Sequence, residues 1–484
     1  MRIDLVSRTA LAFALACGAA PAMAQTVPVS ATAVQSSPRE AGPAPQAEDG
    51  ADGEIVVLGT RRSDRSITDS ASPVDVIGGT ELTTQPAADM LDVVKNIVPS
   101  FFVSQNTISD ASTFVRAPSL RGLPADEILV MVNGKRFNRS ALVQVAGGGD
   151  TALGIGSQGA DISLIPAIAV KNLQILREGA TAQYGSDAIA GVLNYGLKDT
   201  KGFEAIARYG QFYENGGDGE SVQLSAAFGL SVGDAGFINF AGEYFDDNGT
   251  SRGVTRANAA LFAQANPALA EQLPNYPGPV QIWGSSPTDG YKLMVNTGFD
   301  VADYAQLYFF GNLAHATADQ SFNYRPVQAF TAQDTTGATR PLGVNVAFSH
   351  PIYLTPCPAG NATCPAGGFV RDGNVYNFST LYPAGFTPRF VGVKDQAYGV
   401  LGVRGERDGL HYDLSASLSR NSLDLSMYQS LSPSYGPLTQ TEFAFGSLIQ
   451  KEFNANLDLT YALEAGLASA ITLAAGGEFR RESY

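Results

Sequence analysis

Few side chains in this sequence have the spacing that catalysis or metal binding requires. The three histidines, His315, His350 and His411, lie far apart, and none belongs to an H-E-x-x-H pair of the kind that binds zinc in metalloproteases. No G-x-S-x-G segment, the nucleophile motif of serine hydrolases, occurs either. The sequence therefore predicts no enzyme, no resident metal and no cofactor.

Two cysteines do lie close together, in the proline- and glycine-rich segment CPAGNATC. Cys357 and Cys364 are most simply a local disulfide if the protein is exported, because disulfides persist in oxidising compartments. A metal site with two thiolates is the alternative, but the sequence offers no further ligands nearby.

One glycine-rich segment matches a nucleotide-binding pattern. Residues 154–159 (GIGSQG) fit G-x-G-x-x-G, and Glu178 follows at about the position of the acid that binds ribose. The context does not fit, because residues 147–150 (GGGD) do not form the preceding strand and Pro166 interrupts a following helix. We interpret the segment as a loop.

The first residues have the features of an export signal. Arg2 and Arg8 precede the short apolar segment 10–20, and Ala22-Met23-Ala24 is a cleavage site of the A-x-A type, which defines residues 1–24 as a signal peptide. Cys17 as a lipid anchor is the alternative. Residues 25–53 are rich in Ala, Pro, Ser and Gln, which predicts a disordered linker.

Charge and hydropathy exclude two classes of protein. The net charge of −15 leaves no basic stripe to neutralise phosphates, which argues against a nucleic-acid partner. No apolar run reaches 18 residues, so the sequence contains no helical membrane span.

Residues 61–202 have the pattern of one compact α+β domain. Pro86 can begin a helix whose apolar face is Met90, Val94 and Ile97 and which ends before Pro99. Residues 127–132 (EILVMV) predict a buried strand, and Asn133-Gly134 then predicts a tight turn.

The second half of this domain is a strand, a glycine-punctuated turn and a strand. The strands are predicted at 172–178 and 192–198, and the turn between them consists mostly of small residues. The segment ILREGATAQYGSDAIAGVLN closely resembles the signature of the plug domain of TonB-dependent outer-membrane receptors. Leu120-Arg121-Gly122 and Asn133-Gly134-Lys135-Arg136 resemble plug motifs of the same family. The residues that carry the resemblance are Arg121, Gly122, Asn133, Gly134, Arg177, Glu178, Gly179, Tyr184, Gly185 and Gly191.

The resemblance implies roles for several charged residues. Arg121 and Arg177 match plug arginines that pair with carboxylates of the surrounding barrel, which would latch the plug; Glu478 and Glu482 are possible partners. Solvated arginines on the plug surface are the alternative.

A short β-prone run lies upstream of the plug. It resembles the TonB box, the segment that a periplasmic energy-coupling partner binds by adding it to a sheet edge. An ordinary edge strand is the alternative. The run consists of Glu54, Ile55, Val56, Val57, Leu58, Gly59 and Thr60.

After residue 202 apolar and polar residues alternate, which is typical of lipid-facing strands around a wet lumen. Tight turns alternate with long loops after the second strand, as in outer-membrane barrels, whereas a soluble β-sandwich or a β-helix would not show this. Nine strands are predicted, at 203–213, 221–232, 236–246, 290–300, 304–317, 395–406, 410–420, 451–462 and 469–482.

The expected architecture is a plug domain followed by antiparallel transmembrane β-barrel strands, at 203–484. Because the family barrel has about 22 strands, we interpret the chain as the N-terminal part of a receptor. The resemblance implies energy-coupled import at the outer membrane of a Gram-negative cell, with the TonB complex and lipid as partners. A ferric siderophore is the expected small-molecule ligand. The alternatives are cobalamin or oligosaccharide import, a passive porin or secretion barrel, and a soluble carbohydrate-active β-protein.

Overall fold

The computed structural model describes residues 74–87, 89–105, 107–144, 154–177, 181–213, 217–233, 235–326 and 381–463, together with 465–466, 470–484 and short pieces between 331 and 378. The predicted signal peptide, linker and TonB box lie outside the described residues. So do Glu178, Gly179, Cys357 and Cys364.

The first domain is built on a five-stranded sheet in the order β1-β6-β7-β4-β5. Its strands β4 and β7 are parallel and the other pairs are antiparallel. The strands on both sides of the glycine-punctuated turn, β6 and β7, are confirmed, and β4 is the predicted buried strand. The five are β1 (Val74–Gly78), β4 (Ile128–Val132), β5 (Lys135–Arg136), β6 (Val170–Leu176) and β7 (Gly191–Leu197).

Helix α2 (Met90–Ile97) packs on this sheet with α1 (Gly79–Thr84). It ends before Pro99 as predicted but begins later than Pro86, because the Asp89 carboxylate accepts a hydrogen bond from the Leu91 N–H and caps its N-terminus. The other elements of this domain are short: β2 (Phe101–Val103), β3 (Pro118–Leu120), α3 (Thr181–Tyr184) and the 3-10 turns η3 (Ala111–Thr113), η4 (Ala125–Glu127), η6 (Ile162–Leu164), η7 (Ala167–Ala169) and η8 (Ser186–Ala188).

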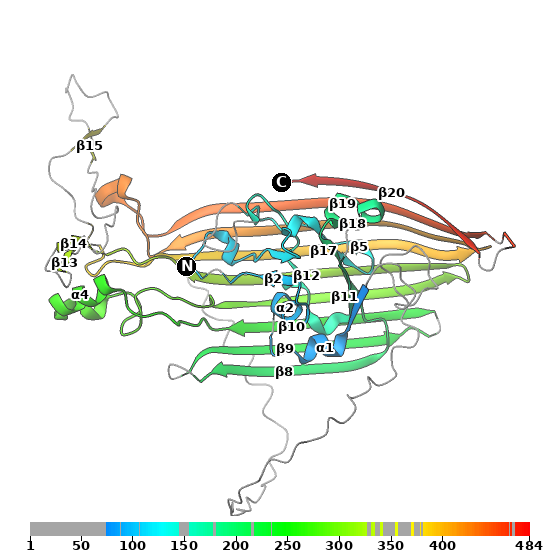
Figure 1. Ribbon diagram of the computed structural model, residues 1–484, viewed down its shortest axis with the longest axis horizontal. Helices are drawn as coiled ribbons and strands as arrows, with labels where there is room; N and C mark the ends of the chain where they lie inside the picture. Colours follow the sequence, from blue (N-terminus) through cyan, green and yellow to red (C-terminus); the bar gives the residue numbers. More distant parts are fainter. Residues whose placement is uncertain are drawn as a thin grey trace, which may run out of the picture. The chain divides into compact units, whose positions relative to one another are not determined.

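The nine predicted long strands are all present, side by side in chain order and antiparallel (Figure 1). Several extend further toward the long connections than the alternation indicated, by up to eight residues in β18 and β19. The strands are β8 (Gly202–Phe212), β9 (Asp218–Ser231), β10 (Gly236–Asp247), β11 (Thr288–Ala302), β12 (Ala305–Ser321), β17 (Arg389–Arg407), β18 (Leu410–Tyr428), β19 (Phe443–Leu463) and β20 (Ile471–Ser483).

The long connections carry small elements of their own. These are α4 (Ala257–Ala265), the 3-10 turns η10 (Pro267–Gln272) and η12 (Pro433–Leu438), and the hairpins β13 (Thr331–Gln333) with β14 (Thr339–Pro341) and β15 (Leu354–Pro356) with β16 (Phe369–Arg371). Among the described residues, no helix is long and apolar enough to cross a membrane.

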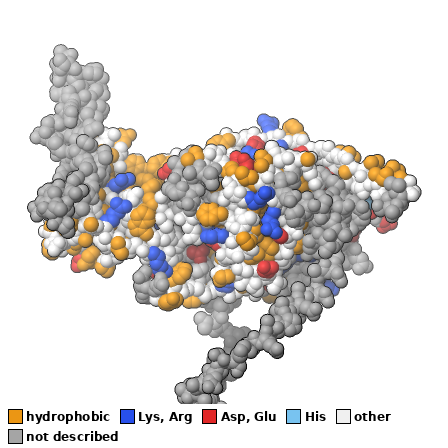
Figure 2. Space-filling model, in the orientation of Figure 1, with side chains coloured by type: hydrophobic (Ala, Val, Ile, Leu, Met, Phe, Trp, Pro, Cys, Tyr) orange, Lys and Arg blue, Asp and Glu red, His pale blue; other side chains and the backbone are white. Residues whose placement is uncertain are grey.

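The two faces of the large sheet are inverted relative to a water-soluble protein. Leucines such as Leu224, Leu313 and Leu418 are about half exposed or more, while polar neighbours such as Gln223 and Asn312 are buried. An apolar outer face and a polar inner face suit a sheet whose outside meets lipid. On the face seen in Figure 2, acidic and basic side chains lie close to one another.

The first domain covers the polar face of the large sheet. Phe137 of the plug packs edge-on against Tyr398 of β17, with ring centroids 4.9 Å apart, within a core that both parts share. An apolar centre surrounded by polar contacts holds the two together.

Candidate functional site: the interface between plug and strands

Hydrogen bonds between side-chain amides and the plug surround the apolar centre of the interface. The Asn312 side-chain amide on β12 donates to the Leu164 backbone carbonyl over 3.1 Å. The Asn421 side-chain oxygen on β18 accepts from the Ala141 N–H over 2.6 Å. Asn138 and Gln396 exchange two hydrogen bonds. The plug therefore supplies further hydrogen-bond partners to polar side chains of the strands that it buries.

Two buried lysines extend from the strands in the same layer. Lys394 of β17 binds the plug, because its Nζ lies 2.9 Å from the Asp161 carboxylate and 3.1 Å from the Ser163 hydroxyl. Lys292 of β11 instead binds Glu243 on the neighbouring strand at 2.6 Å. One pair thus joins plug to sheet and the other lies within the sheet.

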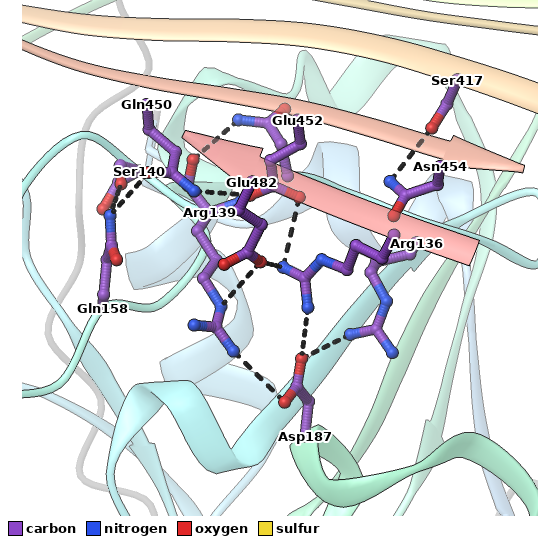
Figure 3. Close-up of polar contacts among 12 residues, drawn as sticks. Arg136, Arg139, Ser140, Gln158, Asp187, Ser417, Gln450, Glu452, Asn454 and Glu482 are labelled. Atoms are coloured by element: carbon purple, nitrogen blue, oxygen red, sulfur yellow. Dashed lines mark hydrogen bonds and ion pairs between the residues drawn. The ribbon is translucent and has the colours of Figure 1, made fainter. Parts of the chain in front are cut away.

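Among the described residues, the largest group of charges surrounds Asp187 (Figure 3). This carboxylate lies 2.6 Å from Arg136, 3.2 Å from Arg139 and 3.0 Å from Arg480. Arg136 and Arg139 belong to the plug and Arg480 to β20. One plug carboxylate therefore holds arginines from both parts of the molecule.

Carboxylates of the strands complete this cluster. Glu452 of β19 accepts from the Arg139 N–H over 2.8 Å and pairs with Arg480 at 3.2 Å. Glu478 pairs with Arg136 at 3.1 Å, and Glu482 lies 4.0 Å from Arg139 and contacts Arg480. We call Arg136, Arg139, Asp187, Glu452, Glu478, Arg480 and Glu482 the charge cluster.

The charge cluster keeps the Asp187 carboxyl ionised. Burial alone would raise its pKa, but the nearby charges of Arg136, Arg139 and Arg480 lower the pKa below the ordinary value. Charge-assisted hydrogen bonds of this kind are strong individually, yet polar groups on both sides can be rehydrated when the surfaces separate.

The arginines expected to form the latch lie elsewhere. Arg177 binds Asp75 inside the plug, with Nε 2.6 Å from Oδ2, and Arg121 donates to the Arg177 carbonyl. The reason is strand pairing: β1 runs antiparallel to β6, which places Asp75 beside the end of β6. Glu478 and Glu482 do face the plug, but their partners are Arg136, Arg139 and Arg480.

The predicted turn at Asn133-Gly134 is confirmed and points a lysine at the strands. Both residues have positive φ, 48° and 76°, as a tight hairpin turn requires. The Asn133 carboxamide accepts from the Leu197 N–H over 2.8 Å. Lys135, next in the chain, lies 3.1 Å from Asp413 and 3.3 Å from Asp458.

The glycines of the signature have separate roles. Gly185 has a φ of 85° and begins the turn that carries Asp187, while Tyr184 offers its carbonyl to Arg136 over 3.5 Å. Gly122 follows Arg121 in a turn where both residues have positive φ. At Gly191 an added Cβ would meet the Leu176 carbonyl oxygen at 2.4 Å.

Sequence reasoning missed Asp161, Asp187, Lys394 and Arg480 as interface residues. Asp187 lies inside the segment that carries the resemblance, and Lys394 and Arg480 lie on or beside predicted strands, where charged residues on the polar side would have indicated a contact.

A separate pocket opens where the strands meet the long connections. Its volume is about 280 Å³, and its lining includes Asp89 and Asp92 at the start of α2 together with Arg116. Arg116 binds both carboxylates, Asp89 at 2.6 Å and Asp92 at 2.9 Å. Burial would raise the pKa of Asp89, but Arg116 and two more distant lysines lower it. The rest of the lining comes from strand ends and loops, including Phe212, Ser221, Asp247, Asn248, Thr250, Ser285, Ser286 and Thr288.

The α+β domain packs on the polar face of the nine-stranded sheet, whose other face is apolar and exposed, and this arrangement is typical of an outer-membrane barrel with a plug. Residues 66–192 match the family model of the TonB-dependent receptor plug domain. Residues 66–192 thus form a plug domain of the TonB-dependent receptor type, and nine antiparallel strands follow it.

Among curated proteins, the chain is similar to a vitamin B12 transporter of Photobacterium profundum, at 27% identity over 40% of this chain and 28% of the relative. It is also similar to a ferric enterobactin receptor of Pseudomonas aeruginosa, at 26% identity over 37% of this chain and 24% of the relative. These relatives are transporters and receptors rather than enzymes.

Solved structures share the fold. The siderophore receptor PirA of Acinetobacter baumannii superposes with a TM-score of 0.52 at 14% identity, over 86% of this chain and 48% of that one. A variant of the ferric enterobactin receptor of Pseudomonas aeruginosa gives 0.51 at 15% identity, over 85% and 49%. The chain thus spans about half the length of these structures, and its matches to the curated relatives cover about a quarter of theirs.

Proposed function

We propose that this chain is the receptor part of an energy-coupled import system of the outer membrane, and that it takes up a ferric siderophore. The observation that supports this most is the polar part of the interface: around a shared apolar centre, the charge cluster and the Lys394–Asp161 pair hold the plug by charged contacts. Such contacts can be exchanged for water when the plug moves.

The proposed cycle assigns a task to each part. The pocket beside the long connections captures the ligand, and the plug closes the path behind it. Residues 54–60 act as the TonB box, which offers an extended backbone to the sheet edge of the inner-membrane partner. Pulling on this segment separates the plug from the strands and lets the ligand pass.

The export signal at 1–24 and the disulfide between Cys357 and Cys364 belong to the same proposal. A signal peptide is required for a protein to reach the outer membrane, and that route passes through the oxidising periplasm. Cobalamin and oligosaccharides are the alternative ligands; the similarity to vitamin B12 transporters favours cobalamin of the two.

A proline substitution in the box tests energy coupling. Leu58→Pro removes a backbone N–H from the segment and disfavours strand pairing, so uptake of iron-loaded siderophore by cells that produce the protein should be lost. Gln46→Pro in the linker is the matched control and should take up ligand normally. Uptake that survives both Leu58→Pro and deletion of 54–60 would favour the passive porin instead.

A further inference from the structure

The pocket beside α2 is lined by more acidic than basic side chains. Three carboxylates line it, Asp89, Asp92 and Asp247, and among its described lining residues Arg116 carries the only positive charge. Arg116 is engaged by both Asp89 and Asp92, and 15% of its side chain is exposed. The pocket therefore presents negative charge to a ligand.

Three other cations near the pocket, Lys292, Lys394 and Arg252, bind carboxylates. A smaller hollow of about 90 Å³ shares several of the pocket's residues and is lined by Lys292 and Lys394. These lysines bind Glu243 and Asp161. Arg252, which lies over the Phe212 ring, pairs with Asp218.

The remaining lining is rich in groups that both donate and accept hydrogen bonds. Hydroxyls of Ser221, Thr250 and Ser285 and the amide of Asn248 surround the carboxylates. The loop segments are fixed against each other, since Thr250 N–H donates to the Ser285 carbonyl over 3.1 Å. A ligand with outward amide and hydroxyl groups finds partners here without a full positive charge on the wall.

We infer that the pocket receives one side of a metal chelate of zero or positive net charge, of the iron(III) tris-hydroxamate type, and not a tri-anionic iron(III) tris-catecholate. The inference rests on the proposed import function and specifies its ligand. Three singly charged hydroxamates neutralise iron(III), whereas three doubly charged catecholates leave three negative charges, which would face the three carboxylates. Bringing like charges together in a partly dehydrated site is unfavourable.

The protein carries a natural reporter for the test. Its single tryptophan, Trp283, precedes the lining residues Gly284 and Ser285, and it packs against Gly253. Iron(III) chelates absorb light and quench tryptophan emission at close range. Titration of the full chain in detergent would use iron(III) desferrioxamine B, which is a cation, iron(III) ferrichrome and cyanocobalamin, which are neutral, and iron(III) enterobactin, which is an anion. Trp283→Phe should abolish the signal.

Removing carboxylate charges from the pocket should weaken the binding of a cationic chelate and strengthen the binding of an anionic one. The unmodified chain should bind the cationic and neutral iron chelates and reject the anion. Asp92→Asn with Asp247→Asn should weaken the cation about tenfold for each charge removed and strengthen the anion. Asp303 lines a different hollow, at the short turns. Asp303→Asn is therefore the control and should leave all affinities unchanged.

Each outcome has a distinct meaning. Binding of iron(III) enterobactin as tightly as the neutral chelates would overturn the inference and leave the import function standing. Binding of cyanocobalamin alone, without the cationic and neutral iron chelates, would also overturn the inference and would replace the siderophore by cobalamin in the proposed function. If no chelate quenches Trp283 or is retained by the protein on a filter, both the inference and the proposed ligand class are wrong.

Discussion

Lys394 of β17 and Asp161 of the plug form a buried ion pair, with Nζ and Oδ2 2.9 Å apart. The Asp161 side chain is 2% exposed and also accepts from the N–H and hydroxyl of Ser163. Lys394 therefore binds a plug carboxylate that hydrogen bonds from Ser163 already hold in position. This pair lies in one buried polar layer with the Asn138–Gln396 contact. Separation of the plug from the strands breaks both contacts and requires water to hydrate the two charges.

Lys394→Met should loosen the plug. The substitution leaves the Asp161 charge buried without its partner, which costs about 3–5 kcal/mol. Urea titration of the purified protein, followed by proteolysis of the plug, should show plug release at lower urea than in the unmodified chain. Asp161→Asn combined with Lys394→Met should recover most of the loss, because no unpaired charge remains.

Lys292→Met is the matched control for that experiment. Lys292 is as buried as Lys394, but its partner Glu243 lies on the adjacent strand. The variant should destabilise the sheet without lowering the urea concentration at which the plug becomes accessible. Equal loosening of the plug in both lysine variants would contradict a specific role for Lys394.

Asp187→Asn should make the receptor leaky. The substitution removes the charge that Arg136, Arg139 and Arg480 share, so three arginines lose a common partner and β20 loses its contact with the plug turn. Uptake of a large antibiotic that the intact plug excludes should rise in cells that produce the variant. Arg121→Ala and Arg177→Ala should leak less, because their contacts lie within the plug.

The acid response of the plug should depend on Asp187. Because the pKa of this carboxyl is lowered in the folded state, its ion pairs contribute fully above about pH 3.9, the ordinary value for aspartate. The contribution is lost as the pH falls through the lower folded-state pKa. Protease accessibility of the plug, measured from pH 7 down to acid, should show a step below that ordinary value that Asp187→Asn lacks; an identical profile in the variant would argue against this assignment.

Much of the architecture could be predicted because it depends on local patterns. Alternation along the strands shows which residues face lipid, and small residues flanked by β-prone runs indicate the strands β6 and β7. The strand ends could not be predicted, since β18 and β19 extend by pairing with each other beyond the alternating segments.

The partners of the charged residues could not be predicted for a similar reason. Arg177 pairs with Asp75, 102 residues away, because β1 joins the sheet beside β6, and no local pattern specifies that neighbour. Asp187 lies 293 residues from Arg480, so only the placement of β20 over the plug brings them together. The residue types of the interface were visible in the sequence, but the pairing required the fold.

Alanine should be more destabilising at Gly191 than at Gly202, a second glycine with nearly the same φ. Gly191 and Gly202 have φ of 150° and 154°, so alanine at either position pays a similar conformational penalty of about 1–3 kcal/mol. An added Cβ at Gly191 would also lie 2.4 Å from the Leu176 carbonyl oxygen and 2.8 Å from Leu120, whereas nothing lies within 4 Å at Gly202. The clash adds about 1–3 kcal/mol, because the β6–β7 pairing has to shift. Urea unfolding should therefore show Gly191→Ala as the less stable variant, with the loss confined to the plug. Equal stability of the two variants would mean that close approach of β6 and β7 is not what requires glycine at position 191.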